Sequence, residues 1–352
     1  MKFDSLKQTL AEREANGEFS GTVLLTKNGE ELFAGAYGFA NRPWQVRNTI
    51  DTRYETASLT KLIASVAVLQ LIDKGQLRLD TAVIPLLGYD TPISDDVTVF
   101  HLLTHSSGIA DDAEEEAGED YADLWKTKPN YAVTELVDFL PNFIHKTPNF
   151  PPGTGVRYNN VGFVLLGLVL EKITGMRFRD YVQTHIFDAI GMTRSGFFHM
   201  ADVHPEVAES YTAVTDENDT PIGWQRAIYM RPPIGSPDGG VYTTAPDMTK
   251  FMDALRNGKL LSPELTKAIF TPQVTYIERE TYDLKYAFAN LIVLDKEGNV
   301  LFTLGQGEDN GVSAKAVYYP EAEVTAVLLA NQGFCTWPLV WEIHELISNA
   351  AS

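Results

Sequence analysis

Hydrophobic and polar residues alternate near the start of the chain in a pattern typical of a helix followed by a hairpin. Residues 1–16 carry apolar positions on one side, which predicts an amphipathic helix. Residues 21–41, GTVLLTKNGEELFAGAYGFAN, alternate on both sides of Asn28 and Gly29, and Asn-Gly between such runs is a strong hairpin signal. Residues 59–74 are mostly apolar and end before a glycine, so they predict a buried helix.

Strand-like segments return only near the end of the chain. Polar turns are expected to join residues 286–295 to 300–305, and 312–320 to 324–332. Residues 337–350 have the spacing of a closing amphipathic helix. Strands from the two ends are therefore expected to meet in one sheet, and their short turns predict antiparallel pairing.

The middle of the chain has a different hydrophobic pattern, because helical periodicity and loops dominate residues 80–235. The predicted fold is α/β (α+β), an antiparallel sheet flanked by helices. We expect residues 1–79 and 236–352 to form this sheet lobe, with residues 80–235 inserted as a mainly helical lobe. The active site is expected between the two lobes.

Composition narrows the class of partners. The chain of 352 residues has 47 acidic and 28 basic side chains, a formal net charge of −19. Such a surface repels polyanions, so neither nucleic acid nor an anionic membrane is an expected partner. The first residues lack the apolar run of a signal peptide, and the apolar run at 161–170 is too short to span a bilayer. A cytoplasmic protein without a membrane span is expected, and its oligomeric state stays open.

Two further features of the composition predict little chemistry. Residues 111–120, DDAEEEAGED, hold seven carboxylates in ten positions and are interpreted as a solvated, mobile loop. Cys335 is the single cysteine, so no intrachain disulfide can form. It is interpreted as an inert thiol in a loop, and the absence of disulfides fits a reducing compartment.

Ser58 and Lys61 stand three residues apart at the start of the apolar helix. Taken alone, the serine could be a helix cap and the lysine a solvated residue of the first turn. A second motif, Tyr158-Asn159-Asn160, follows a Pro-Gly turn and opens another apolar helix. Asn160 could be no more than the cap of that helix, and Tyr158 a half-buried core residue.

Together the two motifs indicate a site for nucleophilic catalysis. Serine is a weak nucleophile until a base removes its proton, and Lys61 is one helical turn away. Partial desolvation at the helix start is expected to lower the pKa of Lys61, which suits proton transfer. The Tyr158 oxygen can complete the relay, and backbone N–H groups at the helix start can stabilise an oxyanion.

These motifs carry a resemblance to a known family. The chain resembles the serine hydrolases of the class C β-lactamase and penicillin-binding protein-like family, which includes D-aminopeptidases and related carboxylesterases. Residues 101–109, 151–160 and 235–252 match as well, and the resemblance runs from about residue 20 to 332. It implies a Ser58 acyl-enzyme served by Lys61 and Tyr158, hence hydrolysis of a small ester, amide or peptide.

The resemblance also implies the remaining site residues. Asn160 is expected to bond Lys61 and the substrate carbonyl, and the backbone N–H of Ser58 is expected to form an oxyanion hole with one near Asp309. The family's third motif has Lys or His followed by small residues, whereas this chain has Gln306-Gly307-Glu308. This departure disfavours substrates with a carboxylate, β-lactams and peptidoglycan peptides among them. Arg157 or Arg231 could supply the missing positive charge.

Other interpretations remain as alternatives. His101 and His105, four residues apart, could suit zinc, although no acidic third ligand stands at a telling position. Residues 311–315 approach the G-x-S-x-G motif of α/β-hydrolases but lack its second glycine. Weak β-lactamase or D-Ala peptidase activity, or a non-catalytic binding module on the same fold, are the functional alternatives. We expect no metal and no cofactor.

Overall fold

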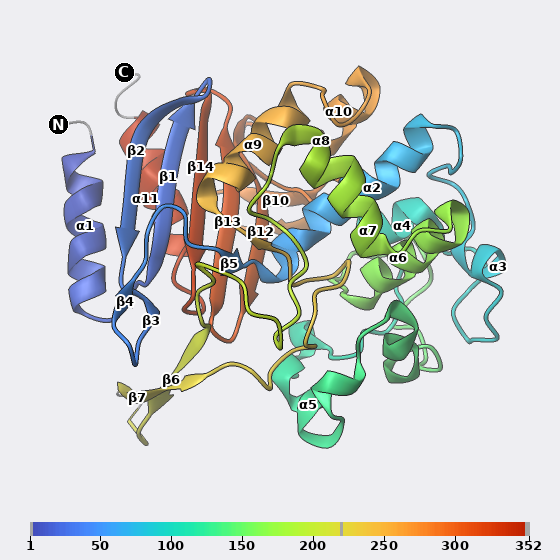
Figure 1. Ribbon diagram of the computed structural model, residues 1–352. Helices are drawn as coiled ribbons and strands as arrows, with labels where there is room; N and C mark the ends of the chain where they lie inside the picture. The colour runs from blue at the N-terminus through green and yellow to red at the C-terminus, as the bar shows by residue number, and fades with distance from the viewer. Residues whose placement is uncertain (1–2, 219–220, 349–352) are drawn as a thin grey trace.

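The strands predicted near the two ends of the chain pair in one antiparallel sheet. The computed structural model describes residues 3–218 and 221–348, and within them this sheet has eight strands (Figure 1). Their order is β2-β1-β14-β13-β12-β11-β10-β9, and every neighbouring pair is antiparallel. The strands are β1 (Gly21–Lys27), β2 (Glu30–Tyr37), β9 (Val274–Glu278), β10 (Asp283–Tyr286), β11 (Leu291–Leu294), β12 (Val300–Asp309), β13 (Val312–Tyr319) and β14 (Val324–Ala330).

The register of β1 against β14 separates two hydrophobic layers. Leu24 lies opposite Val327, and both pack into the core on the side of the inserted helices. Val23 lies opposite Leu328, and both belong to a second core on the other face. Because side chains of a strand alternate between faces, a run of apolar residues buries both faces of the sheet.

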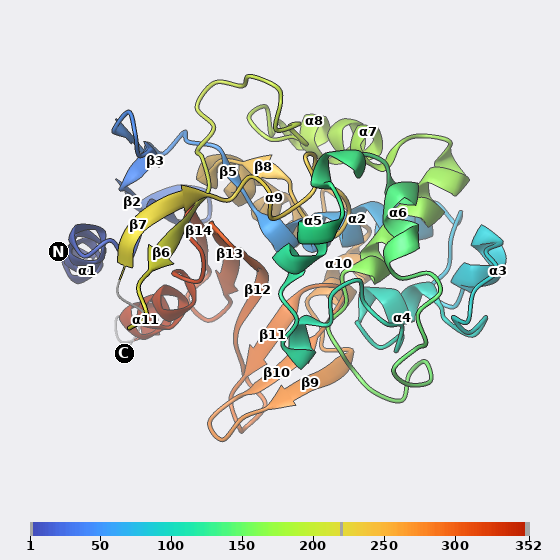
Figure 2. The same ribbon diagram turned by 90° about the horizontal axis from the view of Figure 1, so that it is seen from below.

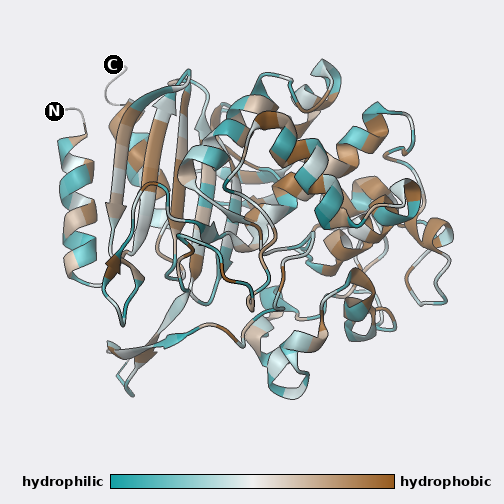
Figure 3. Cartoon of the chain, in the orientation of Figure 1, coloured by the Kyte–Doolittle hydropathy of each residue, from teal (hydrophilic) through white to brown (hydrophobic). Residues whose placement is uncertain are grey.

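Helices cover both faces of the sheet (Figure 2). The two terminal helices contribute buried leucine, valine and isoleucine side chains to the second core. The opposite face is covered by two helices from separate parts of the chain, and Figure 3 shows hydrophobic residues running along the strands between the layers. The terminal pair is α1 (Asp4–Ala15) and α11 (Trp337–Ser348), and the opposite pair is α2 (Thr60–Asp73) and α9 (Ala245–Arg256).

The middle of the chain folds mainly into helices that share the core of α2. The longest of these, α6, is buried from Val161 to Leu170, which explains its nearly continuous apolar sequence. The helical segment from Phe178 to Ile190 is interrupted by a π-helical turn at Gln183–Phe187. The α-helices of the middle of the chain are α3 (Val83–Leu87), α4 (Val99–Leu103), α5 (Leu124–Thr127), α6 (Val161–Thr174), α7 (Phe178–Val182) and α8 (Asp188–Ile190). One more, α10 (Pro263–Ile269), follows α9.

The expectation that strands return only near the end of the chain is wrong. A hairpin, β6 (Tyr211–Thr215) and β7 (Pro221–Arg226), projects from the body in Figure 1. Only Tyr211 among its residues is buried, and the apolar Val214 and Ile222 are exposed, so no buried face gives its sequence an alternating pattern. The predicted strand 286–295 is also divided, since a turn with Ala289 at φ 54° separates β10 from β11.

Short strand pairs lie beside the main sheet. One of them fixes the chain that leads into the nucleophile motif, because β5 ends at Glu55, shortly before Ser58. The pairs are β3 (Phe39–Asn41) with β4 (Val46–Arg47), and β5 (Tyr54–Glu55) with β8 (Tyr242–Thr243).

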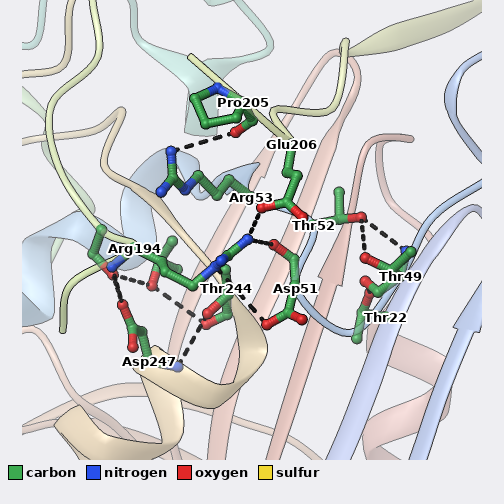
Figure 4. Close-up of polar contacts among 12 residues, drawn as sticks. Thr22, Thr49, Asp51, Thr52, Arg53, Arg194, Pro205, Glu206, Thr244 and Asp247 are labelled. Atoms are coloured by element: carbon green, nitrogen blue, oxygen red, sulfur yellow. Dashed lines mark hydrogen bonds and ion pairs between the residues drawn. The ribbon is translucent and has the colours of Figure 1, made fainter. Parts of the chain in front are cut away.

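A polar network joins the inserted part of the chain to the start of α9 (Figure 4). The buried carboxylate of Asp247 accepts a hydrogen bond from the backbone N–H of Arg194 at 2.8 Å. The Arg194 guanidinium pairs with Glu206 and donates to the backbone carbonyl of Asp51 at 3.1 Å. Thr244 caps α9 by accepting the N–H of Asp247. Three distant segments are thereby held together.

The fold class predicted from the sequence is confirmed: an antiparallel sheet built from both chain ends, flanked by helices, with a mainly helical insertion. The division into lobes at 79/80 and 235/236 stays a prediction. Across residues 3–218 and 221–348, no helix has the length and apolarity to cross a membrane.

Candidate active site

Ser58 lies in a short 3₁₀ helix, η1 (Ala57–Leu59), between β5 and α2. Its Oγ is partly exposed and has two side-chain partners. Lys61 Nζ lies 2.9 Å away, and Tyr158 Oη donates to it at 2.6 Å. The preceding residue, Ala57, has φ 44°, a conformation that a side chain disfavours and that the surrounding contacts hold in place. The candidate nucleophile is thus presented on a tight turn.

Lys61 is buried on the first turn of α2 with three hydrogen-bond acceptors around its ammonium group. Besides Ser58 Oγ, these are Asn160 Oδ1 and the backbone carbonyl of Asp238, both at 2.7 Å. Burial lowers the pKa of Lys61, although Asp238 and Glu115 oppose this effect. Once deprotonated, Lys61 can accept the Ser58 proton through its lone pair while two N–H groups keep the other contacts.

The Tyr158 ring packs against an imidazole and an ammonium group. The buried imidazole of His105 lies 4.8 Å from it, centroid to centroid, and Lys61 Nζ lies 4.9 Å from the ring centre. The backbone N–H of Tyr158 donates to Glu116 Oε1 at 3.0 Å. Burial raises the pKa of Tyr158 well above its usual value, so the phenol stays protonated and acts as a donor to Ser58.

Asn160 does not cap α6 with its side chain. Its Oδ1 accepts from Lys61, and its Nδ2 donates to Glu115 Oε2 at 2.8 Å. Asn159 supplies a local contact instead, because its Oδ1 accepts the N–H of Gly162 at 2.7 Å. The amide of Asn160 is therefore oriented by a cation on one side and a carboxylate on the other.

The acidic segment 111–120 is not simply a solvated loop, and that part of the interpretation is wrong. Asp111 and Asp112 are buried, and the Asp111 carboxylate accepts the backbone N–H groups of Asn160 at 2.8 Å and Val161 at 3.0 Å. It thereby stabilises the start of α6, where backbone N–H groups lack helical partners. Residues 115–120 are exposed, as predicted, and Glu115 contacts the candidate active site.

The strand β12 forms the other wall of the site. Gly307 packs against the backbone of Ser58, and Gln306 is half-buried in a cavity of about 520 Å³ that also contains Ser58, Lys61 and Tyr158. Glu308 and Asp309 line the same cavity. The three residues at the third motif, Gln306, Gly307 and Glu308, therefore lie at or beside the site, as does Asp309, which was expected near the oxyanion hole.

The two β12 carboxylates already have cationic partners. Glu308 pairs with the fully buried Lys315 on β13. Asp309 lies 3.6 Å from Arg231, which also pairs with the buried Glu55. Glu55 in turn accepts the backbone N–H of Ala57 at 2.8 Å, so this ion cluster braces the turn that carries Ser58.

A second, smaller cavity of about 70 Å³ also opens at Ser58. Apolar and aromatic side chains supply part of its wall. They include Phe198, Met200, Pro232, Pro233, Ile234 and Tyr242. Both cavities at the nucleophile also have carboxylates in their walls, in the smaller one those of Glu55, Glu115, Asp238, Glu308 and Asp309.

The zinc interpretation of His101 and His105 is not supported by their placement. The helix α4 ends at Leu103, and His105 follows it with φ 58°, so the two rings do not share a helix face. His101 Nδ1 accepts the N–H of Thr98, while His105 Nδ1 accepts that of Asn159. Within residues 3–218 and 221–348, no group of three potential ligands could hold a metal ion.

Cys335 is buried just before α11, and burial raises its thiol pKa to about 12, which keeps it protonated.

The prediction from the sequence missed three residues of the site, Glu115, His105 and Asp238. Glu115 lies in the acidic segment that was interpreted as a solvated loop, so its contact with Asn160 was not expected. Asp238 contributes its backbone carbonyl, and any residue type could do so.

Comparisons with known proteins agree with this geometry. A model of the beta-lactamase family matches residues 6–335. The structure of a penicillin-binding protein from Bacillus halodurans has a TM-score of 0.88 at 36% identity, covering 96% of this chain and 99% of that one. Esterase EstB of Burkholderia gladioli is 30% identical over 281 residues, 73% of this chain and 70% of EstB. PbpX of Bacillus subtilis (strain 168), named as a penicillin-binding protein, is 30% identical over 255 residues, 72% of this chain.

Fold and site together define a serine hydrolase of the β-lactamase fold. The chain belongs to the beta-lactamase family. The match to PbpX spans 59% of the length of that relative.

Proposed function

We propose that the protein hydrolyses a small ester or amide through an acyl-enzyme on Ser58. One observation carries the proposal: Ser58 Oγ contacts both Lys61 Nζ and Tyr158 Oη, at 2.9 and 2.6 Å. A hydroxyl between a buried amine and a protonated phenol can lose its proton to one and return it through the other. The family relationship to an esterase and to penicillin-binding proteins supports the same chemistry.

In the first half of the reaction, Ser58 Oγ attacks the substrate carbonyl and passes its proton to Lys61. The bond to the leaving alcohol or amine breaks, and the leaving group takes the proton through Tyr158. In the second half, a water molecule gives a proton to the same pair and attacks the acyl carbon. The acid product leaves, and Ser58 regains its proton. Atoms balance over the two halves, because one water is consumed for each bond cleaved.

The oxyanion of each half-reaction is assigned to backbone N–H groups. We assign one to Ser58 and a second to β12 near Asp309, since Gly307 brings that strand against the Ser58 backbone. Asn160 is assigned to the Lys61 contact and to the substrate carbonyl. Gln306 is assigned to the wall of the acyl site, where it can donate a hydrogen bond without a charge.

A turnover panel tests the proposal. It contains short-chain p-nitrophenyl esters, D-amino acid amides, D-Ala-D-Ala peptides and a chromogenic cephalosporin. We expect the neutral esters or amides to be turned over by wild type and not by Ser58→Ala. A fluorophosphonate probe should label Ser58, located by mass spectrometry. A folded protein that neither turns over nor labels would instead be the non-catalytic module.

Weak β-lactamase or D-Ala peptidase activity is the second candidate function, favoured by the similarity to penicillin-binding proteins. The same panel separates it from the first. The cytoplasmic location and the absence of a nucleic-acid partner stay predictions from composition.

A further inference from the structure

Arg231 connects the two parts of the site to which the oxyanion donors are assigned. Its side chain is buried, with 8% of its surface exposed, and lies in the wall of the smaller cavity. On one side the guanidinium pairs with the buried Glu55 at the end of β5. On the other side it pairs with Asp309 at the end of β12 and donates to the backbone carbonyl of Asn310. One cation therefore bridges the chain before the nucleophile and the strand opposite.

The contact with Glu55 reaches the nucleophile turn through one further hydrogen bond. Glu55 Oε1 accepts the backbone N–H of Ala57 at 2.8 Å, while Oε2 receives Arg231. Ala57 has φ 44°, a backbone conformation that costs energy and persists only where the surrounding contacts enforce it. The Ser58 N–H belongs to the peptide group that follows Ala57, so its direction depends on this turn.

On the side of β12, steric fit is supplemented by charge. Gly307 allows close approach, since a Cβ atom there would stand 2.8 Å from the Ser58 nitrogen, but contacts between uncharged atoms attract only weakly. The guanidinium adds a stronger attraction, because Arg231 Nε lies 3.6 Å from Asp309 Oδ2. Arginine suits this place, since its planar group presents several donors in a fixed arrangement, whereas lysine is a point charge on a flexible stem.

Arg231 is itself held in place and stays charged. Its backbone carbonyl accepts a hydrogen bond from Asn130 Nδ2 at 2.8 Å. Burial alone would lower its pKa, but the charges of Glu55 and Asp309 raise that pKa above its ordinary value. The bridge therefore persists at every pH at which the protein is folded and the two carboxylates are ionised.

We infer that Arg231 is a positioning residue of the oxyanion hole, which holds the donor of the nucleophile turn and the donor of β12 at the separation that a tetrahedral intermediate requires. The inference rests on the proposed function and adds a residue that acts through Glu55 and Asp309. Both half-reactions pass through an oxyanion, so displaced donors should lower kcat whichever half limits turnover. KM should change little, because the carbonyl oxygen of the bound substrate carries only a partial charge.

Two variants test the bridge with p-nitrophenyl acetate as substrate. Arg231→Lys keeps the positive charge and loses the planar group, so kcat should fall about tenfold or more, with KM within about threefold of the wild-type value. Arg231→Met combined with Glu55→Gln removes both charges of the buried pair, which avoids leaving one of them unpaired. Here kcat should fall about 10²-fold. Circular dichroism and urea unfolding verify that each variant is folded.

Inhibition by phenylboronic acid measures the oxyanion hole directly. Ser58 Oγ adds to the boron atom and forms a tetrahedral anion that resembles the reaction intermediate, so its affinity reports how well the site stabilises that charge. In both variants the inhibition constant should rise by about the same factor as kcat falls. A residue that only stabilises the fold would change the free energy of unfolding without this parallel.

Arg179→Lys is the matched control. Arg179 on α7 donates to the backbone carbonyl of Gly235 at 3.2 Å and pairs with Glu135, so it anchors the same segment of chain away from Glu55 and Asp309. The substitution should leave kcat and the inhibition constant at their wild-type values. It separates anchoring of the segment from bridging of the two donors.

The outcomes are distinct. Wild-type kcat in folded Arg231 variants, or the same loss of kcat in Arg179→Lys, overturns the inference while the proposed function stands. A fall in kcat without a matching rise in the inhibition constant also overturns it, since the loss would then lie outside the oxyanion hole. If wild type turns over the ester no faster than Ser58→Ala, the proposed function fails, and the inference fails with it.

Discussion

Gly307 lies so close to Ser58 that no side chain fits between β12 and the nucleophile turn. A Cβ atom at position 307 would stand 2.8 Å from the backbone nitrogen of Ser58 and 2.0 Å from the carbonyl oxygen of Thr56. Real Cβ contacts do not reach these distances, so an alanine would push the strand and the turn apart. The glycine is required for close approach of two backbones, one of which carries the nucleophile.

Gly307→Ala should therefore lower kcat/KM by about 10²-fold, because a shift of about 1 Å in catalytic geometry has that effect. Gly223→Ala is the matched control, since the added Cβ at that position in β7 meets no atom within 4 Å. Steady-state kinetics and circular dichroism of both variants check the prediction. Wild-type kinetics in a folded Gly307→Ala would show that β12 does not set the geometry of Ser58.

The contacts among Ser58, Lys61 and Tyr158 predict that the three groups act as one unit. Ser58→Ala, Lys61→Ala and Tyr158→Phe should each lower kcat by about 10²-fold or more. The double variants should lose much less than the product of the single losses, because either single change already breaks the proton relay. Kinetics of all three double variants provide the measurement. Multiplying losses would mean that the groups work independently, and full activity of Ser58→Ala would exclude the proposed nucleophile.

The sequence predicted the centre of this site because it lies on local structure. Ser58 and Lys61 meet across one helical turn, and Tyr158 opens a helix whose apolar residues mark its start. The contact of Glu115 with Asn160 was not predicted, because it joins residues 45 apart through a loop with no hydrophobic period. Loop conformation depends on tertiary partners, here the buried Asp111 that holds the start of α6.

In the strands, too, the features set by the local sequence could be predicted, and those set by tertiary contacts could not. The two apolar strands β13 and β14 could be predicted, since burial of both faces leaves a continuous signal. Glu308 was predicted as a residue of the candidate site. The hydrophobic pattern of the strands gave no indication that Lys315 on β13 would pair with it. Cross-strand partners follow from register, and register is set by the whole sheet.

His105 should make stability depend on pH in the acidic range. Burial lowers its pKa from 6.5 to about 3 in the folded protein, with the charge of Lys61 as a smaller cause. Between these values the unfolded chain binds a proton that the folded protein does not. The stability contributed by neutral His105 is therefore complete above about pH 6.5 and is lost as the pH falls toward 3, at a slope of about 1.4 kcal/mol per unit.

His105→Phe removes this titration and keeps an aromatic ring beside Tyr158. The difference in unfolding free energy, wild type minus variant, should shrink as the pH falls from 6.5 to 4.5, measured by urea unfolding. Burial raises the pKa of Asp111 to about 7, so this group makes stability fall as the pH rises, the opposite of His105. The contribution of Asp111 is present in both proteins and cancels in the difference. A difference that stays constant over this range would show that His105 is not held neutral.

Gln306 should decide how the site treats a substrate with a carboxylate. Its side chain lines the larger cavity beside Ser58 and can donate a hydrogen bond, but it carries no charge. The two arginines that could supply one are engaged: Arg157 pairs with Glu114 at 2.7 Å, and Arg231 pairs with Glu55. In the part of the chain that the structure describes, an anionic substrate therefore meets carboxylates in the cavity wall, and both arginines are already paired.

The comparison uses kcat/KM for a neutral p-nitrophenyl ester and for a carboxylate-bearing cephalosporin. Wild type should prefer the ester strongly. Gln306→Lys should narrow the gap by about ten- to a hundred-fold, the equivalent of a charge-assisted hydrogen bond of roughly 1.5–3 kcal/mol. Gln306→Met, which has similar volume and no charge, is the control and should leave the preference for the ester in place. The prediction is contradicted if wild type has the same kcat/KM for both substrates and Gln306→Lys leaves the ratio of the two values unchanged. Charge on β12 would then not select the substrate.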